Sequence, residues 1–210
     1  MSRRSANRER LLDVAERLFA ARGSQAVSLR EINTTAGVSQ GVLHYQFGGR
    51  EGLIEALLNR RLPAITESRR RYVQQLREQQ VEVTSRHVVE ILLLPLAELA
   101  LKEGRAGQRF LRLLDNLSRE RNPTFERVVA RYFDELWGVF TELAERVFPR
   151  RSLSETRYRL LLVSYSMYIA AAELVSPHPW MLDTDPSVAT PEQRLNILID
   201  MYCHGLTGRS

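Results

Sequence analysis

The 210-residue chain contains a single cysteine, Cys203, and a single lysine, Lys102. One cysteine excludes an internal disulfide framework and suits a reducing compartment. The longest apolar-rich stretch, residues 160–172, is shorter than the roughly 20 residues of a membrane span and contains serines and tyrosines. Residues 1–4 lead into an amphipathic helical pattern, not into the apolar core of a signal peptide. These absences predict a cytoplasmic protein with no membrane partner.

The sequence also lacks the motifs of common enzyme sites. It has no glycine-rich phosphate loop and no nucleophile elbow. His87 and Glu90 lie one helical turn apart but have no third ligand for a metal ion. Cys203 and His204 are adjacent, and adjacent side chains on a helix diverge by about 100°, so they form no catalytic dyad. We therefore predict no enzyme, no catalytic residue, no cofactor and no metal site.

The positive charge of the chain is concentrated near its start. The net charge is +5, and the residues through Arg61 include ten arginines against six acidic residues. Such a basic segment is an electrostatic footprint for nucleic acid, although a solvated helical surface has the same composition. Because the cationic side chains are almost all guanidinium groups, they suit phosphate and guanine recognition.

Apolar residues recur at helical spacing along the whole chain, and no stretch alternates with the period of a strand. The sequence therefore predicts an all-α fold. Pro63 is expected to end or kink the fourth helix, and residues 176–190 form a long loop. We place an N-terminal domain at 1–52 and a helical domain at 53–210, linked by the fourth helix. The expected helices are 7–22, 29–36, 39–45, one from about 50, 64–80, 84–103, 108–121, 124–148, 154–175 and 191–207.

The stretch from Val27 to Leu53 carries the most specific local signals. Ser28 is placed to cap a helix, and Glu31 to reach back to the amide of Ser28. Gly37 ends this helix, because glycine adopts the left-handed conformation without penalty. Ser39 is then expected to cap the next helix. Two short capped helices separated by so tight a turn predict a helix-turn-helix that packs on a longer helix.

A set of positions in this stretch carries a family resemblance: Ala36-Gly37-Val38-Ser39, Gly41, Leu43, Tyr45, Phe47, Arg50-Glu51 and Leu53. At these positions the stretch resembles the DNA-binding signature of TetR-type transcriptional regulators. The resemblance covers about the first fifty residues; beyond them only length and helical pattern are similar. It implies a ligand-responsive regulator, in most members a repressor, that is released from DNA when an effector shifts helix four. Here Asn33 replaces the usual alanine, Arg50 a lysine and Gly49 a Ser or Asn cap.

The second helix of a helix-turn-helix lies in the major groove with its N-terminal residues at the base edges. Gln40 suits adenine and Val42 suits a thymine methyl group. Gly41 either permits close approach of backbone and DNA, which we favour, or merely weakens the helix. His44, Tyr45 and Gln46 carry groups suited to phosphate oxygens and sugar edges; the alternative is that one of His44 and Tyr45 simply packs. Arg3 and Arg4 either enter the minor groove as an arm or lie in solvent. The predicted DNA-binding residues are Arg3, Arg4, Ser28, Arg30, Ser39, Gln40, Gly41, Val42, His44, Tyr45, Gln46 and Arg50.

One such unit makes too few contacts for a specific site, so we expect a homodimer on a palindromic double-stranded DNA operator. The helix at 154–175 is apolar on nearly every side, which requires burial on every side. The resemblance agrees, since such regulators dimerise through their last two long helices. The expected interface residues are Leu161, Tyr165, Ala172, Leu195, Leu198 and Tyr202.

Aromatic residues among the middle helices are either ordinary core or the lining of an apolar pocket. As a set they favour a hydrophobic or aromatic small-molecule effector over a sugar or nucleotide. A helical adaptor that uses the N-terminal unit for protein contacts is the alternative, but it does not require Gln40 and Gly41 at a helix start. The candidate pocket residues are His87, Phe110, Tyr132, Phe133, Trp137, Phe140, Tyr165 and Tyr168.

Overall fold

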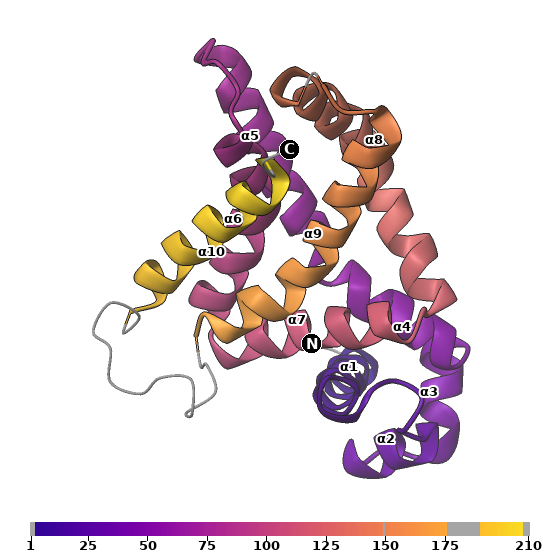
Figure 1. Cartoon of the computed structure of the whole chain (residues 1–210). Helices are drawn as coiled ribbons and strands as arrows, with labels where there is room; N and C mark the ends of the chain where they lie inside the picture. The colour runs from indigo at the N-terminus through magenta and orange to yellow at the C-terminus, as the bar shows by residue number, and fades with distance from the viewer. Residues whose placement is uncertain (1–2, 149, 176–189, 208–210) are drawn as a thin grey trace.

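The computed structural model describes residues 3–148, 150–175 and 190–207, with the backbone alone for Arg3 and Glu135. These residues form ten α-helices and no strand, which confirms the all-α prediction (Figure 1). Nearly all of the predicted loop 176–190 lies outside them. None of the described helices has the length and apolarity of a membrane span. The helices are α1 (Arg3–Arg22), α2 (Leu29–Thr35), α3 (Gln40–Phe47), α4 (Arg50–Asn59), α5 (Leu62–Glu78), α6 (Ser85–Glu103), α7 (Arg105–Arg119), α8 (Pro123–Val147), α9 (Leu153–Glu173) and α10 (Pro191–Thr207).

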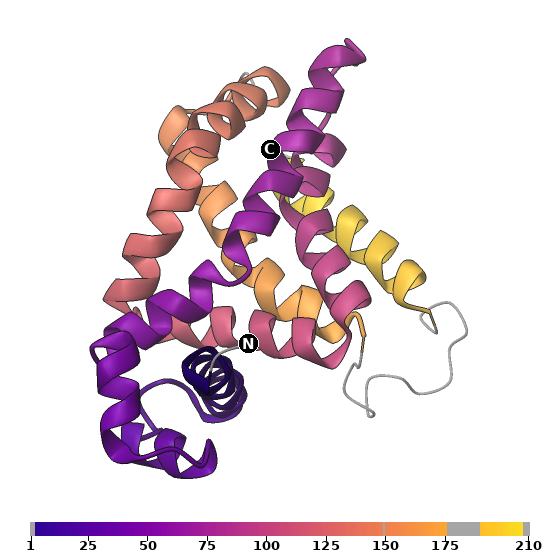
Figure 2. The same cartoon turned by 180° about the vertical axis from the view of Figure 1, so that it is seen from behind.

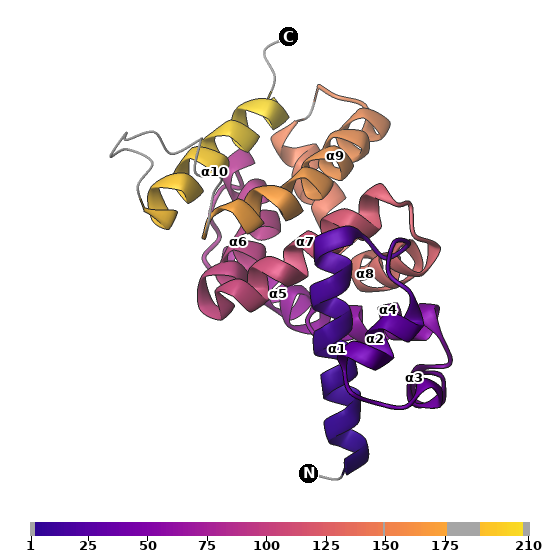
Figure 3. The ribbon, with the colours of Figure 1, turned by 90° about the horizontal axis from the view of Figure 1, so that it is seen from below.

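The N-terminal helices share one small core. Leu11 and Phe19 of α1, Ile32 of α2, Leu43 of α3 and Leu53 of α4 are all fully buried. Helices of seven and eight residues are unstable alone in water, so α2 and α3 depend on this packing. Figure 3 shows how the long α1 runs past both of them. Because α4 supplies Leu53, it belongs to this core as well as leading away from it.

The predicted break at Pro63 is present. Helix α4 ends at Asn59, and α5 begins at Leu62 with Pro63 in its first turn. A proline is tolerated there because the amide that it lacks has no partner within the helix. The two helices are therefore joined directly by Arg60 and Arg61, and Figure 2 shows α5 leading from the N-terminal helices into the rest of the molecule.

Helix α7 lies at the centre of the C-terminal part and contacts α1, α6 and α9. Phe110, Leu114 and Leu117 on this helix are fully buried. Gly107 permits the close crossing with α6, since a Cβ at this position would lie 2.2 Å from the carbonyl oxygen of Leu99. The helix that packs on the N-terminal core is thus also part of the C-terminal core.

The predicted basic arm at the N-terminus is wrong. Helix α1 already begins at Arg3, so Arg3 and Arg4 belong to a helix. The side chain of Gln46 donates a hydrogen bond to the carbonyl oxygen of Arg4 at 3.2 Å. The guanidinium of Arg4 lies 5.1 Å from the ring centroid of Tyr45. These contacts with α3 hold the first turn of α1, and they come from residues about 40 positions away, which local sequence cannot indicate.

The cap predictions are confirmed in part. The Ser28 hydroxyl accepts a hydrogen bond from the Glu31 amide at 3.1 Å, and Gly37 has a left-handed φ of 63°. The Glu31 carboxylate, however, binds Arg22, and does not complete the capping box. Ser39 occupies the N-cap of α3, but its side chain makes no capping hydrogen bond. The Ser28 cap of α2 and the left-handed Gly37 therefore form as predicted, whereas the Ser39 hydroxyl does not cap α3.

Candidate functional site

Helix α3 presents a polar, exposed N-terminus. Ser39, Gln40 and Gly41 are exposed, and Val42 is half-buried. Leu43 points the other way and is fully buried. A helix anchored by one apolar residue, with its first turn open to solvent, has the arrangement that a recognition helix needs to reach base edges.

Asn33 fixes α3 relative to α2. This residue is buried, and its Nδ2 donates hydrogen bonds to the carbonyl oxygens of Leu29, at 3.1 Å, and Gln40, at 3.2 Å. An alanine, which the resemblance leads one to expect here, can make neither bond. Asn33 is therefore a positioning residue for α3. The sequence singled it out as a replacement of the usual alanine but did not indicate this role.

The C-terminal half of α3 carries three of the predicted backbone-contact residues. His44 and Tyr45 are exposed, Tyr45 to 72%. Gln46 is held by its bond to Arg4, so the start of α1 and the end of α3 form one surface. The ring of Tyr45 lies beside the Arg4 guanidinium, so the Tyr45 hydroxyl and the positive charge of Arg4 are close together. This pair suits a phosphate oxygen.

Gly41 is not required by the fold. Nothing lies within 4 Å of a Cβ added at this position, and its φ is outside the left-handed region. A glycine inside a helix destabilises it by about 1 kcal/mol relative to alanine. Since no neighbour within the described chain demands the missing side chain, close approach of an outside partner explains it better than internal packing.

The remaining predicted contacts divide into two groups. Ser28 and Arg30 are exposed at the start of α2, where helix amides and a guanidinium can hold a phosphate. Arg50 instead donates a hydrogen bond to the carbonyl oxygen of Ser24 and lies 5.9 Å from the ring centroid of Phe19. In this structure Arg50 thus stabilises the link after α1, away from the exposed turn of α3.

A pocket of about 460 Å³ opens between α8 and α9. Four of the predicted aromatic residues line it: Phe133 and Trp137 from α8, and Tyr165 and Tyr168 from α9. Val129, Ala130, Leu161 and Ser164 complete the mainly apolar wall, and Arg121, Glu126 and Asp134 are the charged members. Leu161, predicted at the dimer interface, thus borders the pocket. A cavity of this size with a few polar groups is typical of a small-molecule site.

The other four predicted pocket residues do not line this cavity. Phe110 and Phe140 are buried in the core. His87 accepts a hydrogen bond from the amide of Thr84 at 3.1 Å and so caps α6. Tyr132 donates a hydrogen bond to Asn59 Oδ1 at 2.9 Å. The aromatic set therefore contains core, cap and pocket residues together, because helical spacing predicts burial but not which neighbour a side chain faces.

Arg69 of α5 is buried behind the pocket and is 3% exposed. Its guanidinium carbon lies 4.6 Å from the ring centroid of Phe133, and Nη2 donates to the carbonyl oxygen of Leu92 at 3.2 Å. Nε has no hydrogen-bond partner among the described residues. Burial lowers the pKa of Arg69 to about 10, so the group is still protonated at neutral pH. Sequence reasoning did not select this residue.

The wall of the pocket is connected to α4. Helix α8 contributes Val129 and Phe133 to the pocket, and Arg127, Arg131 and Tyr132, on the same turns, contact α4. Glu55 of α4 pairs with Arg131 at 2.7 Å and with Arg127 at 3.3 Å. These ion pairs lower the pKa of Glu55, the hydrogen bond from Arg131 being the largest cause. The wall of the pocket and α4 are therefore joined by direct side-chain contacts.

A second connection runs from α1 to α7. Asn116 Nδ2 donates hydrogen bonds to the carbonyl oxygens of Phe19, at 2.9 Å, and Ala20, at 3.0 Å, which are among the last of α1. Glu120 accepts a hydrogen bond from the amide of Ser24 at 2.7 Å, and another from its hydroxyl. The bond to Ala20 satisfies a carbonyl oxygen that a helix end leaves without an intrahelical partner. The bond to Phe19 is a second one, because its carbonyl oxygen also accepts from the Gly23 amide at 2.9 Å.

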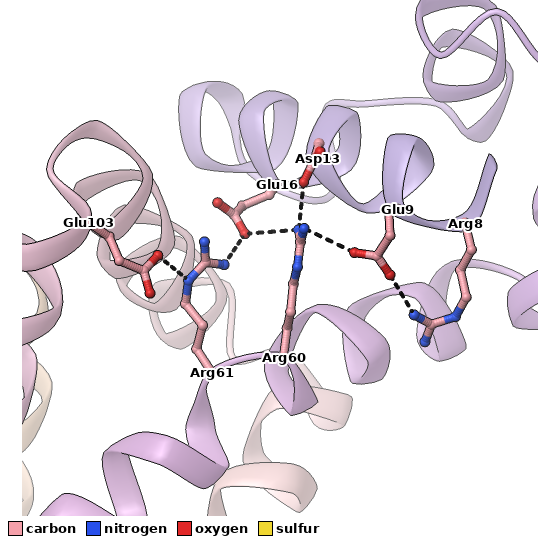
Figure 4. Close-up of polar contacts among 7 residues, drawn as sticks. All are labelled: Arg8, Glu9, Asp13, Glu16, Arg60, Arg61 and Glu103. Atoms are coloured by element: carbon pink, nitrogen blue, oxygen red, sulfur yellow. Dashed lines mark hydrogen bonds and ion pairs between the residues drawn. The ribbon is translucent and has the colours of Figure 1, made fainter. Parts of the chain in front are cut away.

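Arg60 and Arg61, between α4 and α5, bind α1 through its acidic face (Figure 4). Arg60 pairs with Glu9 at 3.1 Å and Asp13 at 2.7 Å. Arg61 bridges Glu16, at 2.6 Å, and Glu103 of α6, at 3.0 Å. Burial raises the pKa of Glu16, and the charge of Arg61 opposes that shift. The junction is therefore tied to both parts of the molecule.

An apolar face of α9 and α10 is exposed. The predicted interface residues lie partly elsewhere: Ala172 and Tyr202 are buried within the chain, while Leu195 and Leu198 are half-buried. Large apolar side chains exposed in a row are unusual for a surface without a partner. They are Tyr158, Leu161, Leu162 and Ile169 on α9 and Ile197 and Met201 on α10.

The fold and the exposed α3 define a helix-turn-helix protein whose further helices contain a pocket. Residues 11–57 match the family described as "Bacterial regulatory proteins, tetR family", and residues 90–205 match "Tetracyclin repressor-like, C-terminal domain". The chain belongs to the TetR family of DNA-binding transcriptional regulators. Members of this family are generally not enzymes.

Among characterised proteins, the chain is 39% identical over 57 residues to the HTH-type transcriptional repressor KstR2 of Rhodococcus jostii. That match spans 27% of this chain and 28% of the relative. The structure of the ketosteroid transcriptional regulator KstR2 of Mycobacterium tuberculosis aligns with a TM-score of 0.60 at 15% identity, over 92% of this chain and 93% of that one. NalD, the secondary repressor of the MexAB-OprM multidrug efflux pump in Pseudomonas aeruginosa, aligns with a TM-score of 0.56 at 20% identity, over 96% and 97%. At these identities the structural likeness concerns the fold.

Proposed function

We propose that this protein is a ligand-responsive repressor that binds a palindromic operator as a homodimer. The observation that carries the DNA-binding part is the first turn of α3, where Ser39, Gln40 and Gly41 are exposed on a helix anchored by Leu43. Gln40 reads a base edge through its amide, and Gly41 lets the backbone approach the groove. Tyr45, Arg4 and Arg30 bind phosphates on either side.

The exposed apolar face supports the homodimer. Tyr158, Leu162 and Ile169 follow one another along α9 at helical spacing, and Ile197 and Met201 extend the exposed apolar surface onto α10. A two-fold axis through this face buries the same residues from both copies. It also sets two recognition helices on one DNA duplex, so that one operator contains two half-sites in inverted orientation.

Effector control acts through α8. A ligand between α8 and α9 contacts Phe133 and Trp137, and the neighbouring residues Arg131 and Tyr132 hold α4. A ligand shifts the equilibrium between two states only by its difference in affinity for them. We expect this difference to arise where α8 contacts α4, because α4 packs on the DNA-binding helices.

The experiment that tests this function is selection of random duplexes by the purified chain, followed by titration against salt. The expected result is an inverted repeat, bound by two chains, with an affinity that falls steeply as salt rises. Exchanging Leu162 and Met201 for glutamate is expected to give monomers that bind the repeat weakly. Weak binding without sequence preference contradicts the proposal and favours the alternative, a helical adaptor that uses the N-terminal unit for protein contacts.

A further inference from the structure

Arg69, the cation behind the pocket, is buried without a counter-charge from the described residues. In the part of the chain that the structure describes, Nε has no hydrogen-bond partner and no carboxylate lies within ion-pair distance of the guanidinium. Nη2 bonds the carbonyl oxygen of Leu92, and the charged face rests on the ring of Phe133. Buried charges in proteins are normally paired, because removal from water is costly without a counter-charge.

The partners of Arg69 lie at the pocket. Phe133, whose ring covers the guanidinium, lines the cavity and is half-exposed. Tyr168, the group that interacts electrostatically with Arg69, also lines it. Arg69 itself does not line the cavity, so its guanidinium can contact a bound molecule only if the Phe133 ring moves aside. The hydroxyl of Tyr168 remains a donor at neutral pH, because burial raises its pKa to about 12.

The charges at the cavity define an orientation. Glu126 and Asp134 are exposed carboxylates in its lining, and Arg121 pairs with Glu126 at 3.4 Å. An anionic group beside these carboxylates is repelled, whereas next to Arg69 it gains a counter-charge in a medium of low dielectric constant. The apolar part of the same molecule then fills the aromatic section between Trp137 and Tyr165.

We infer that the effector is an apolar compound with a carboxylate, and that Arg69 and Tyr168 bind this carboxylate behind the aromatic wall of the pocket. The inference rests on the proposed ligand control and adds the chemical class of the ligand. It also assigns a route for the signal. Arg69 belongs to α5, which follows α4 after two residues, so a carboxylate bound to Arg69 acts on α5 while the ring system acts on α8.

The test uses three probes of one shape and different charge: 2-naphthylacetate, 2-naphthylacetamide and 2-(2-naphthyl)ethylammonium. Their affinities for the full chain are measured by titration calorimetry. We expect the carboxylate to bind at least about tenfold more tightly than the amide, and the ammonium most weakly. In Arg69→Met the carboxylate is expected to lose its advantage to within about twofold, while the amide binds as before.

Two further variants keep the comparison sharp. Arg71→Met removes an exposed arginine from the same helix and is expected to leave the preference for the carboxylate unchanged. Tyr168→Phe removes one donor and is expected to reduce that preference by about threefold, which tests the site even where Arg69→Met does not fold. Circular dichroism verifies the fold of each variant.

The outcomes separate this inference from the proposed function. Equal binding of the carboxylate and the amide to the wild-type chain overturns the inference and leaves ligand control intact. Binding of the carboxylate that depends on Arg69 but does not weaken operator binding supports the inference and contradicts ligand control. Failure of all three probes to bind at millimolar concentration contradicts the inference, because each of them contains the apolar ring system that the pocket is expected to hold.

Discussion

The proposed DNA-binding surface and the pocket are built in different ways. The surface comes mainly from one contiguous stretch, and its functional side chains point outward from helices whose backbone is fixed by Ser28, Asn33 and Gly37. The pocket joins α8 and α9, with a cation supplied by α5 from behind. A local motif therefore specifies the first site, whereas only tertiary packing assembles the second. Variants that leave one site intact while changing the other test this division.

The largest effect is expected from Gly52→Ala. A Cβ at this position would lie 1.8 Å from the carbonyl oxygen of Phe47, a backbone atom that cannot move without displacing the end of α3. We expect a loss of unfolding free energy of about 3 kcal/mol and loss of DNA binding, measured by denaturation and by operator titration.

Gly138→Ala is the matched control for this change. Gly138 also lies in a helix, but nothing is within 4 Å of its added Cβ. It is expected to stabilise the chain by roughly 0.5–1 kcal/mol. Equal stability of the two variants contradicts the close approach of α4 to the end of α3.

Gly41→Ala separates folding from DNA binding. The added methyl group meets nothing within the described chain, so we expect stabilisation by about 0.5–1 kcal/mol in denaturation. Operator affinity is expected to fall by about tenfold, because the methyl group occupies the space between backbone and groove. If affinity is unchanged, Gly41 is a simple helix weakener and the DNA approaches α3 differently.

Asn116→Ala tests how strongly α7 holds the DNA-binding unit. It removes two hydrogen bonds to the last carbonyls of α1, and we expect a loss of about 1–2 kcal/mol in chemical denaturation. Arg105→Ala, an exposed change on the same helix, is the control and is expected to stay within about 0.5 kcal/mol of the wild type. A neutral Asn116→Ala result means that the helix end is satisfied by water.

Tyr132→Phe gives the smallest effect and tests the connection between the two sites. It removes the hydrogen bond to Asn59 while keeping the ring. We expect unchanged operator affinity without ligand and a roughly twofold to fivefold smaller weakening when 2-naphthylacetate is bound. The same weakening as in the wild type contradicts a signal through this contact and leaves the Glu55 ion pairs as the route.

Local signals were sufficient for most of the fold. Ser28, Gly37 and Pro63 predicted helix limits because capping, left-handed turns and proline depend on nearest neighbours. They failed at α1, whose first turn is held by Gln46 and by Tyr45 from α3. An arm and a first helical turn have the same local sequence, and only the distant partner decides between them.

The sites were predictable to different degrees for the same reason. Helical spacing identified buried aromatic residues but placed Phe110 and Phe140 in the pocket, since it does not define which neighbour they face. Arg69 was missed within the run Arg69-Arg70-Arg71, which has the composition of a solvated face. One signal was present: Arg69 lies one turn from both Ile65 and Val73, on the buried side of α5.

The central claim is that the first turn of α3 reads DNA sequence, and Gln40→Ala tests it most directly. The affinities of the wild type and the variant are measured for the selected operator and for a duplex with one changed base pair in each half-site. We expect the variant to lose about 1–3 kcal/mol for the operator and most of its discrimination at that pair, with an unchanged melting temperature. Equal discrimination by both proteins contradicts the account, because an exposed Gln40 that reads no base leaves α3 without its assigned role.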